Sequence, residues 1–209
     1  MSVTALLGIL FVALVGAASP GPATVAIATT SAGQGAKAGL AFASGVVAGS
    51  FTWSIAAALG LSAVMLANAW LLDIIRYAGA SYLAYLAWKS ARAAWGGTPP
   101  TLQANAKLQS HKTLFLKGLF LHLTNPKAIL FFGALFAFVI KPGTPWETVF
   151  LVVAAVGAQS TVIFLGYAIL FSRPIVRAAY ERAARGIQGA CAVVFAGFSV
   201  QLITARLGT

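Results

Sequence analysis

The sequence carries little charge for its length, and acidic residues are especially scarce. Among 209 residues there are 14 lysines and arginines but only three aspartates and glutamates, and charged residues make up 8% of the chain. Hydrophobic residues make up 60%, and the mean hydropathy is +0.90. A soluble domain of this size needs far more charge to cover its surface. The composition therefore excludes a soluble globular fold and predicts a polytopic membrane protein.

Residue types that carry redox, metal or hydrolytic chemistry are almost absent. Cys191 is the single cysteine, so the chain can form neither an internal disulfide nor a Cys-X-X-Cys pair. The two histidines stand at no spacing from a glutamate that is typical of a metal site. No nucleophile is paired with a base in the apolar runs. We therefore expect no metal, no cofactor and no enzymatic activity.

Long hydrophobic runs, in contrast, fill most of the chain. Crossing a bilayer takes about 20 residues as a helix, and the apolar runs reach this length. No lysine or arginine precedes the first run, as a cleaved secretory signal requires, so we expect that run to be retained. The predicted spans are residues about 3–32, 38–63, 66–89, 113–140, 147–172 and 186–207.

The predicted fold class is all-α and polytopic, with about six transmembrane helices in a single transmembrane domain that takes up residues 1–209. The first half of this domain covers about 1–95 and the second about 113–209. A polar cytoplasmic linker at about 96–112 joins the two halves. Because each half has an odd number of spans, the second half is expected to be inverted relative to the first.

The net charge of +11 is distributed unevenly among the links between spans. The second link has no basic residue and the fourth has only Lys141, whereas the other three are basic. This alternation is the positive-inside rule, so we expect the basic links in the cytoplasm and both termini outside. We expect membrane lipid as the partner of these charges, and no nucleic acid. The residues concerned are Lys37; Lys89, Arg92, Lys107, Lys112 and Lys117; and Arg173, Arg177, Arg182 and Arg185.

The first span of each half is broken by proline. Pro20–Pro22 interrupts the first span, and Asn125–Pro126 interrupts the fourth. Proline removes a backbone donor, so the carbonyls before each break, near Ser19 and Thr124, lose their partners. In a membrane such groups are satisfied by protein, water or ligand. A proline kink can serve packing alone, but matched breaks in two halves indicate a transporter with its site near mid-membrane.

Lys127 follows the second break, and at about 1.5 Å per residue it lies near mid-depth in its span. A lysine can snorkel to the interface, but an ionisable residue at this depth indicates a site. Beside a helix N-terminus it suits a carboxylate. Gln159 belongs to a polar cluster in the fifth span that either lines a cavity or binds helices together. The predicted substrate-binding residues are Ser19, Pro20, Gly21, Pro22, Thr124, Asn125, Pro126, Lys127 and Gln159.

Two further ionisable side chains, Asp73 and His122, are candidates for coupling to a proton. Asp73 has Arg76 one turn further on, which favours an interfacial ion pair over a proton or cation site. His122 lies one turn before Pro126 and can titrate near neutral pH. Capping of a freed backbone group is the simpler interpretation of this histidine.

Three stretches closely resemble the LysE/RhtB family of amino-acid exporters: SPGPATVAIATTSAGQGAKAGLAFASGVVAG, YAGASYLAYLAWKSAR and FLKGLFLHLTNPKAILFF. The likeness covers nearly the whole chain. It implies a bacterial inner-membrane exporter of amino acids or close derivatives, driven by the membrane potential or a proton gradient. Many members carry Asp or Asn after the PGP motif, where this chain has Ala23, and Asn where it has His122.

We therefore expect a secondary active transporter that exports amino acids or small amino-acid derivatives across the bacterial inner membrane. The scarcity of acidic residues argues against a strongly cationic substrate. The alternatives are an exporter of an inorganic ion of the wider superfamily, a membrane-embedded enzyme and a structural protein. The sequence leaves open the substrate, the coupling ion and whether the protein forms a homo-oligomer.

Overall fold

The computed structural model describes residues 1–67, 69–96, 108–140 and 143–204. Over these residues the chain is entirely helical, with turns and short connections between helices. The helices are α1 (Val3–Ala18), α2 (Pro22–Gln34), α3 (Ala36–Ala67), α4 (Ala69–Gly96), α5 (His111–Leu123), α6 (Pro126–Val139), α7 (Trp146–Leu170) and α8 (Pro174–Thr204). The predicted all-α class is confirmed.

Both predicted helix breaks are present. The axes of α1 and α2 differ in direction by 56°, and those of α5 and α6 by 58°. Each new helix starts with a proline, Pro22 in α2 and Pro126 in α6, where the missing N–H costs nothing because the first turn has no partner for it. The two bent pairs therefore correspond to the predicted first and fourth spans.

Three further helical stretches are long and apolar enough to cross a membrane: Ala36–Gly60, Trp146–Leu170 and Pro174–Thr204. With each bent pair counted as one span, the described residues provide up to five candidate spans. The predicted third span corresponds to α4, which is not among the five and continues to Gly96, beyond the predicted end near residue 89. The chain is thus a polytopic helical membrane protein.

The predicted start of the last span, near residue 186, is wrong as a helix boundary. The helix α8 begins at Pro174, so the link before it is short. Proline at the first position pre-sets the helical φ, and Arg177, Arg182 and Arg185 fall within this helix. The basic link predicted from the sequence is therefore largely helical.

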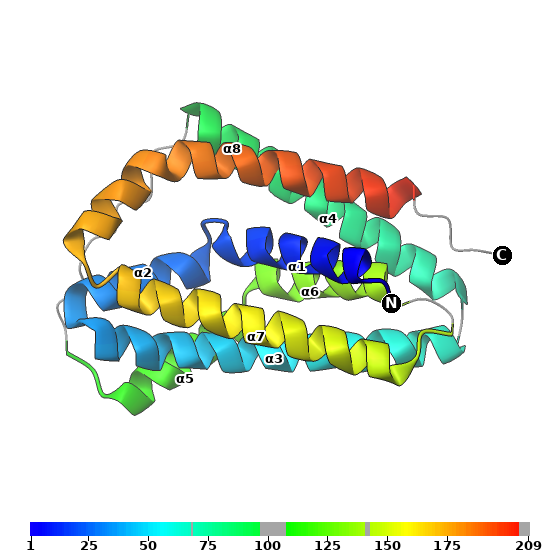
Figure 1. Ribbon diagram of the computed structural model, residues 1–209, viewed down its shortest axis with the longest axis horizontal. Coiled ribbons are helices and arrows are strands. Elements are labelled where there is room, and N and C mark those ends of the chain that lie inside the picture. The colour runs from blue at the N-terminus through cyan, green and yellow to red at the C-terminus, as the bar shows by residue number, and fades with distance from the viewer. Residues whose placement is uncertain (68, 97–107, 141–142, 205–209) are drawn as a thin grey trace.

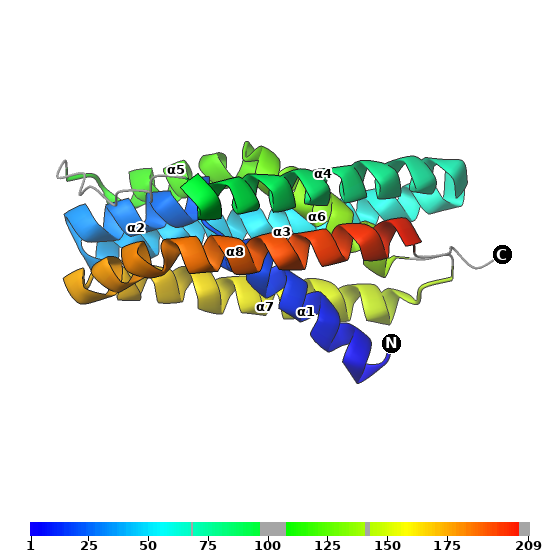
Figure 2. The same cartoon turned by 90° about the horizontal axis from the view of Figure 1, so that it is seen from above.

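Three of the four helices of the broken pairs lie between long helices, whereas α5 packs along α3 (Figure 1). The helix α4 packs along α8, and α3 packs along α7, while α1, α2 and α6 lie between these pairs (Figure 1). In the view turned by 90°, α1 crosses α7 obliquely (Figure 2). Phenylalanines of α6 and α8 and valines of α7 form much of the central core. Of the residues at the two breaks, Ser19 and Asn125 are buried, whereas Pro22, Thr124 and Pro126 are exposed.

Glycines bring α3 and α5 into close contact. A Cβ atom at Gly45 would overlap the carbonyl oxygen of Phe115, and Gly118 of α5 lies equally close to the backbone of α3. One turn beyond Gly45, a Cβ at Gly49 would lie 2.9 Å from the Cβ of His122. Small residues of this kind permit close approach of membrane helices. They place the last turn of α5, with His122, directly against the middle of α3.

Candidate functional site

A lysine of the second break is bonded to the first break. The ammonium of Lys127 donates to the backbone carbonyl of Ser19 at 3.0 Å and also to the Ser19 hydroxyl. The carboxamide oxygen of Asn125 accepts from the Lys127 backbone N–H at 3.0 Å and so caps α6. A Cβ at Gly21 would lie 3.2 Å from the Lys127 ammonium nitrogen, so glycine leaves room for this side chain. The two breaks thus meet through Lys127.

The carbonyls that the first break frees are all bonded to side chains. Each of the four carbonyls from Gly16 to Ser19 accepts a hydrogen bond from a side chain. In chain order the donors are the hydroxyls of Ser19 (3.1 Å), Thr24 (3.4 Å) and Tyr167 (3.4 Å) and the ammonium of Lys127 (3.0 Å). Protein groups therefore satisfy this break, as a membrane interior requires. Three of the donors are neutral hydroxyls, and the fourth is a cation on a long side chain.

The second break is closed mainly by local hydrogen bonds. The backbone N–H and the hydroxyl of Thr124 both donate to the carbonyl of Phe120, at 2.9 and 2.7 Å. The N–H of Asn125 donates to the carbonyl of His122 at 3.2 Å. Thr124 and Pro126 are exposed. Of the residues predicted at this break, Asn125 and Lys127 reach the interior.

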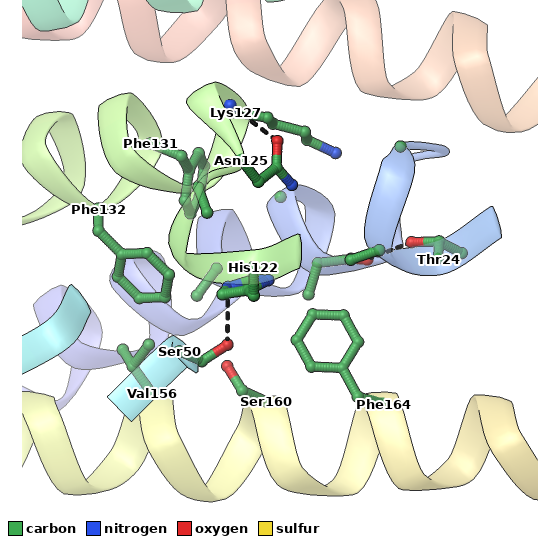
Figure 3. A pocket seen from close by; sticks show the side chains of 16 residues that line it. Thr24, Ser50, His122, Asn125, Lys127, Phe131, Phe132, Val156, Ser160 and Phe164 are labelled. Atoms are coloured by element: carbon green, nitrogen blue, oxygen red, sulfur yellow. Dashed lines mark hydrogen bonds between the residues drawn. The ribbon is translucent and has the colours of Figure 1, made fainter. Parts of the chain in front are cut away.

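A cavity of about 50 Å³ lies where the two breaks meet (Figure 3). One water needs about 10–15 Å³ on this measure, so the cavity can hold more than a single water. Its wall is mainly apolar with a few convergent polar groups, which is typical of small-molecule sites. The lining residues are Ala13, Gly16, Ala17, Gly21, Ala23, Thr24, Ser50, His122, Asn125, Lys127, Ala128, Phe131, Phe132, Val156, Ser160 and Phe164.

His122 lies in the wall of this cavity and is only 4% exposed. Its Nε2 is hydrogen-bonded to the hydroxyl of Ser50 at 3.1 Å, and its Nδ1 is buried without a hydrogen-bond partner. The interpretation of His122 as a cap for a freed backbone group is therefore wrong. Ser50, Thr24 and Tyr167 could not be identified from the sequence, because the partner of each lies in another helix.

Several other predicted residues that the structure describes do not line the cavity, among them Ser19, Thr124 and Pro126. The carboxamide nitrogen of Gln159 donates to the carbonyl of Leu10 at 3.0 Å, so this side chain joins α7 to α1, and its neighbour Ser160 lines the cavity instead. Pro20 and Pro22 shape the break without lining the cavity. Asp73 falls in α4, but its side chain and that of Arg76 lie outside the described part of the structure.

No cluster of metal-ligating side chains occurs in the part of the chain that the structure describes. Cys191 is buried in α8. The arrangement can therefore bind a small charged molecule through a lysine, helix termini and carbonyls.

Comparison with known proteins gives the family. The family model described as LysE type translocator matches residues 14–206. The chain belongs to the LysE type translocator family. Its membership confirms the expected amino-acid exporter and favours a transporter over an enzyme.

Several relatives of this LysE type translocator carry names that describe efflux. The threonine efflux protein of Escherichia coli (strain K12) is 30% identical over 201 residues, which cover 96% of this chain and 98% of the relative. The homoserine/homoserine lactone efflux protein of Salmonella typhimurium is 32% identical over 156 residues, 74% of each chain. The leucine efflux protein of Enterobacter sp. (strain 638) is 30% identical over 203 residues, 95% of this chain and 93% of the relative. No solved structure matches.

Proposed function

We propose that this translocator is a secondary active transporter that exports small neutral amino acids or close derivatives, and that the cavity between its two helix breaks is the substrate site. The observation that carries the proposal is the ammonium of Lys127 at the junction of the breaks, bonded to Ser19. The relatives' names, threonine, homoserine and leucine efflux proteins, support a neutral substrate. The cavity lining also contains no aspartate or glutamate to pair with a cationic side chain.

The substrate carboxylate binds between Lys127 and the N-terminus of α2. That helix begins after Gly21, which provides no side-chain cap, and Gly21, Ala23 and Thr24 all line the cavity. The first N–H groups of a helix attract anions. The substrate ammonium replaces that of Lys127 at the Ser19 carbonyl, and Lys127 turns to the carboxylate. When the zwitterion binds, the protein loses the charge-assisted hydrogen bond from Lys127 to Ser19 and gains several charge-assisted hydrogen bonds to the substrate.

Transport then proceeds by exposure of this site to alternate sides of the bacterial inner membrane. The proposed topology has six spans in two inverted halves, about 1–95 and 113–209. The directions of the helices support it, since α3 and α7 run in opposite directions, as do α4 and α8 (Figure 1). Paired broken helices in inverted halves are typical of secondary transporters that rock one part against another. Coupling to a proton is also part of the proposal, and of the two candidate residues, Asp73 and His122, we assign this role to Asp73.

The proposed orientation of the protein in the membrane follows from the positions of its basic residues. The basic links all belong to the end of the bundle where α2 meets α3, where α4 ends and α5 begins, and where α7 meets α8 (Figure 1). We propose that this end faces the cytoplasm and that both termini face the periplasm, in accordance with the positive-inside rule.

An export assay tests the proposal. Purified protein in liposomes loaded with a mixture of radiolabelled amino acids should release neutral ones, and Lys127→Gln should abolish most of this release while the protein still inserts and folds. Lys112→Gln is the control, because Lys112 is an exposed residue of the first turn of α5, away from the cavity. Release of no amino acid by the wild type, or normal release by Lys127→Gln, would contradict the proposal.

A further inference from the structure

A small cluster of aromatic and aliphatic side chains packs between the end of α7, the start of α8 and α2. Its buried centre is Phe171 with Ala28, which are 2% and 0% exposed. The ring of Phe171 lies 5.3 Å from that of Tyr167 and 5.0 Å from that of Tyr180, measured between centroids. We call this cluster the aromatic plug. The partly buried side chains that complete it are Val25, Tyr167, Val176 and Tyr180.

The aromatic plug lies between the cavity and the end of the bundle where α7 meets α8. Along α7, Phe164 lines the cavity, and Tyr167 and Phe171 follow about one and two turns further on. Along α2, Thr24 lines the cavity, and Ala28 follows one turn later. Both helices run toward the same end of the bundle (Figure 1). A molecule that moves from that end to the cavity between α2 and α7 therefore meets the plug first.

A hydrogen bond connects the plug with the first helix break. The hydroxyl of Tyr167 donates to the carbonyl of Ala18 at 3.4 Å. This carbonyl is one of those that the break frees, because Pro22 has no N–H to offer it. A neutral hydroxyl at this distance makes a weak hydrogen bond, which can break and form again at modest cost. Tyr167 therefore ties the plug to the break and stabilises the packed arrangement.

The hydroxyl of Tyr180 has the opposite effect. It is buried without a hydrogen-bond partner, although its ring packs edge to face on Phe171. A buried hydroxyl without a partner has lost its contact with water and gained nothing in exchange, so it raises the free energy of the packed arrangement. Separation of the start of α8 from α2 would return this hydroxyl to water. One tyrosine thus stabilises the closed plug, and the other destabilises it.

The small size of the plug suits an element that opens. Among the described residues it forms a cluster of its own, apart from two larger hydrophobic clusters. Opening it separates few apolar side chains, and elements that move in function have few such contacts. Phe171 also lies in the link of residues 171–173 between α7 and α8, where a change of backbone direction disturbs neither helix. The start of α8, with Tyr180, can therefore move as one unit.

We propose that the aromatic plug is the inner gate of this translocator and closes the path between the cytoplasm and the cavity. The bond from Tyr167 to Ala18 favours the closed state, and the unpaired hydroxyl of Tyr180 favours the open state. Substrate enters while the plug is open, and the cavity is occluded when the plug packs again. The inference rests on the proposed function, which provides the substrate site and the direction of entry.

Access to the cavity from the cytoplasmic side tests this gate. In the full-length protein with Cys191→Ala, Ser160→Cys places a thiol in the cavity wall at a residue that is 6% exposed. The rate at which the impermeant anion sulfonatoethyl methanethiosulfonate modifies this thiol is measured in inside-out membrane vesicles. Because modification requires the open gate, Tyr167→Phe should raise the rate about 2- to 10-fold by removing a hydrogen bond. Tyr180→Phe should lower it about fivefold or more by removing the unpaired hydroxyl.

Tyr85→Phe is the matched control, since Tyr85 is a 47% exposed tyrosine of α4 outside the plug. Its rate should equal that of the protein with an intact gate. The opposite signs expected of two Tyr→Phe changes distinguish a gate from general loosening, which would raise both rates. Unchanged rates in Tyr167→Phe and Tyr180→Phe, or changes of the same sign, would overturn the inference.

Export from liposomes separates failure of the gate from failure of the proposed function. If the protein exports amino acids but neither tyrosine variant alters modification, the gate is wrong and the substrate site stands. If the wild type exports no amino acid, the proposed function itself is overturned.

Discussion

The ammonium of Lys127 is hydrogen-bonded to the backbone carbonyl of Ser19, which lies 108 residues earlier in the chain, at 3.0 Å. Each residue belongs to a different helix break, so this bond joins the two interrupted spans. A lysine ammonium among freed carbonyls is chemically the same as the ammonium of an amino acid. We infer that Lys127 occupies the substrate's amino site when the cavity holds no substrate, and that it is displaced when a zwitterion binds.

The two prolines that begin α2 and α6 should be needed for transport and not for stability. Pro22→Ala and Pro126→Ala each restore a backbone N–H and permit a continuous helix. We expect each variant to keep or raise the thermal midpoint in detergent and to lose most export activity. Pro174→Ala is the control, because Pro174 begins α8 without a broken span before it. Normal export by either variant would show that its proline is a packing kink.

Gly45 should be needed for the contact between α3 and α5. A Cβ at this position would overlap the backbone of α5, which cannot move as a side-chain end can. Overpacking of this kind costs about 1–3 kcal/mol, so Gly45→Ala should lower the thermal midpoint by several degrees. Gly60→Ala, in the same helix but with nothing within 4 Å of its Cβ, should not. Equal midpoints for the two variants would contradict the close contact.

Cysteine labelling tests the orientation. In a Cys191→Ala background, a cysteine at Thr144, between α6 and α7, should react with an impermeant thiol reagent in intact cells. A cysteine at Gln103, in the predicted cytoplasmic linker, should react only after the cells are permeabilised. Labelling of position 103 but not of position 144 in intact cells would reverse the proposed topology.

Proton coupling should depend on Asp73 and not on His122. The His122 ring is hydrogen-bonded to Ser50 inside the cavity. We therefore assign the proton-coupling role to Asp73. In liposomes with an imposed pH gradient, Asp73→Asn should abolish the part of export that the gradient drives, whereas His122→Gln should retain it. Glu147→Gln, at the start of α7, is the control. If both Asp73→Asn and His122→Gln retain pH-driven export, coupling proceeds through the membrane potential or the substrate's own charge.

The features that could be predicted from the sequence are those that local chemistry determines. Proline cannot continue a helix, so Pro20–Pro22 and Asn125–Pro126 located both breaks to the residue. The long apolar runs located most of the long helices, and an isolated lysine in such a run drew attention to Lys127, which lines the cavity. None of these predictions required knowledge of which helices are neighbours.

The features that could not be predicted depend on which side chains meet across helices. The pairs His122 with Ser50 and Tyr167 with the carbonyl of Ala18 join residues 72 and 149 positions apart. Periodicity does not register a single serine in an apolar run, and no local signal connects it with a histidine in another helix. The boundary of α8 was missed for another reason, since hydropathy marks where apolar residues begin and not where the helix begins.

The claim that Lys127 binds the substrate carboxylate is tested most directly by a thermodynamic cycle. The cycle combines one substitution in the protein with one change in the ligand. Binding to the purified protein is measured for a neutral amino acid and its amide, with the wild type and with Lys127→Gln. A charge-assisted contact is worth about 1.5–3 kcal/mol, so either change alone should weaken binding about 10- to 100-fold. Lys127→Arg should restore part of the affinity, because it keeps the charge and alters its shape. The account predicts that the amide weakens binding to the wild type far more than to Lys127→Gln, since the two changes remove one contact. Equal losses from the amide in both proteins would show that Lys127 is a structural residue and would contradict the account.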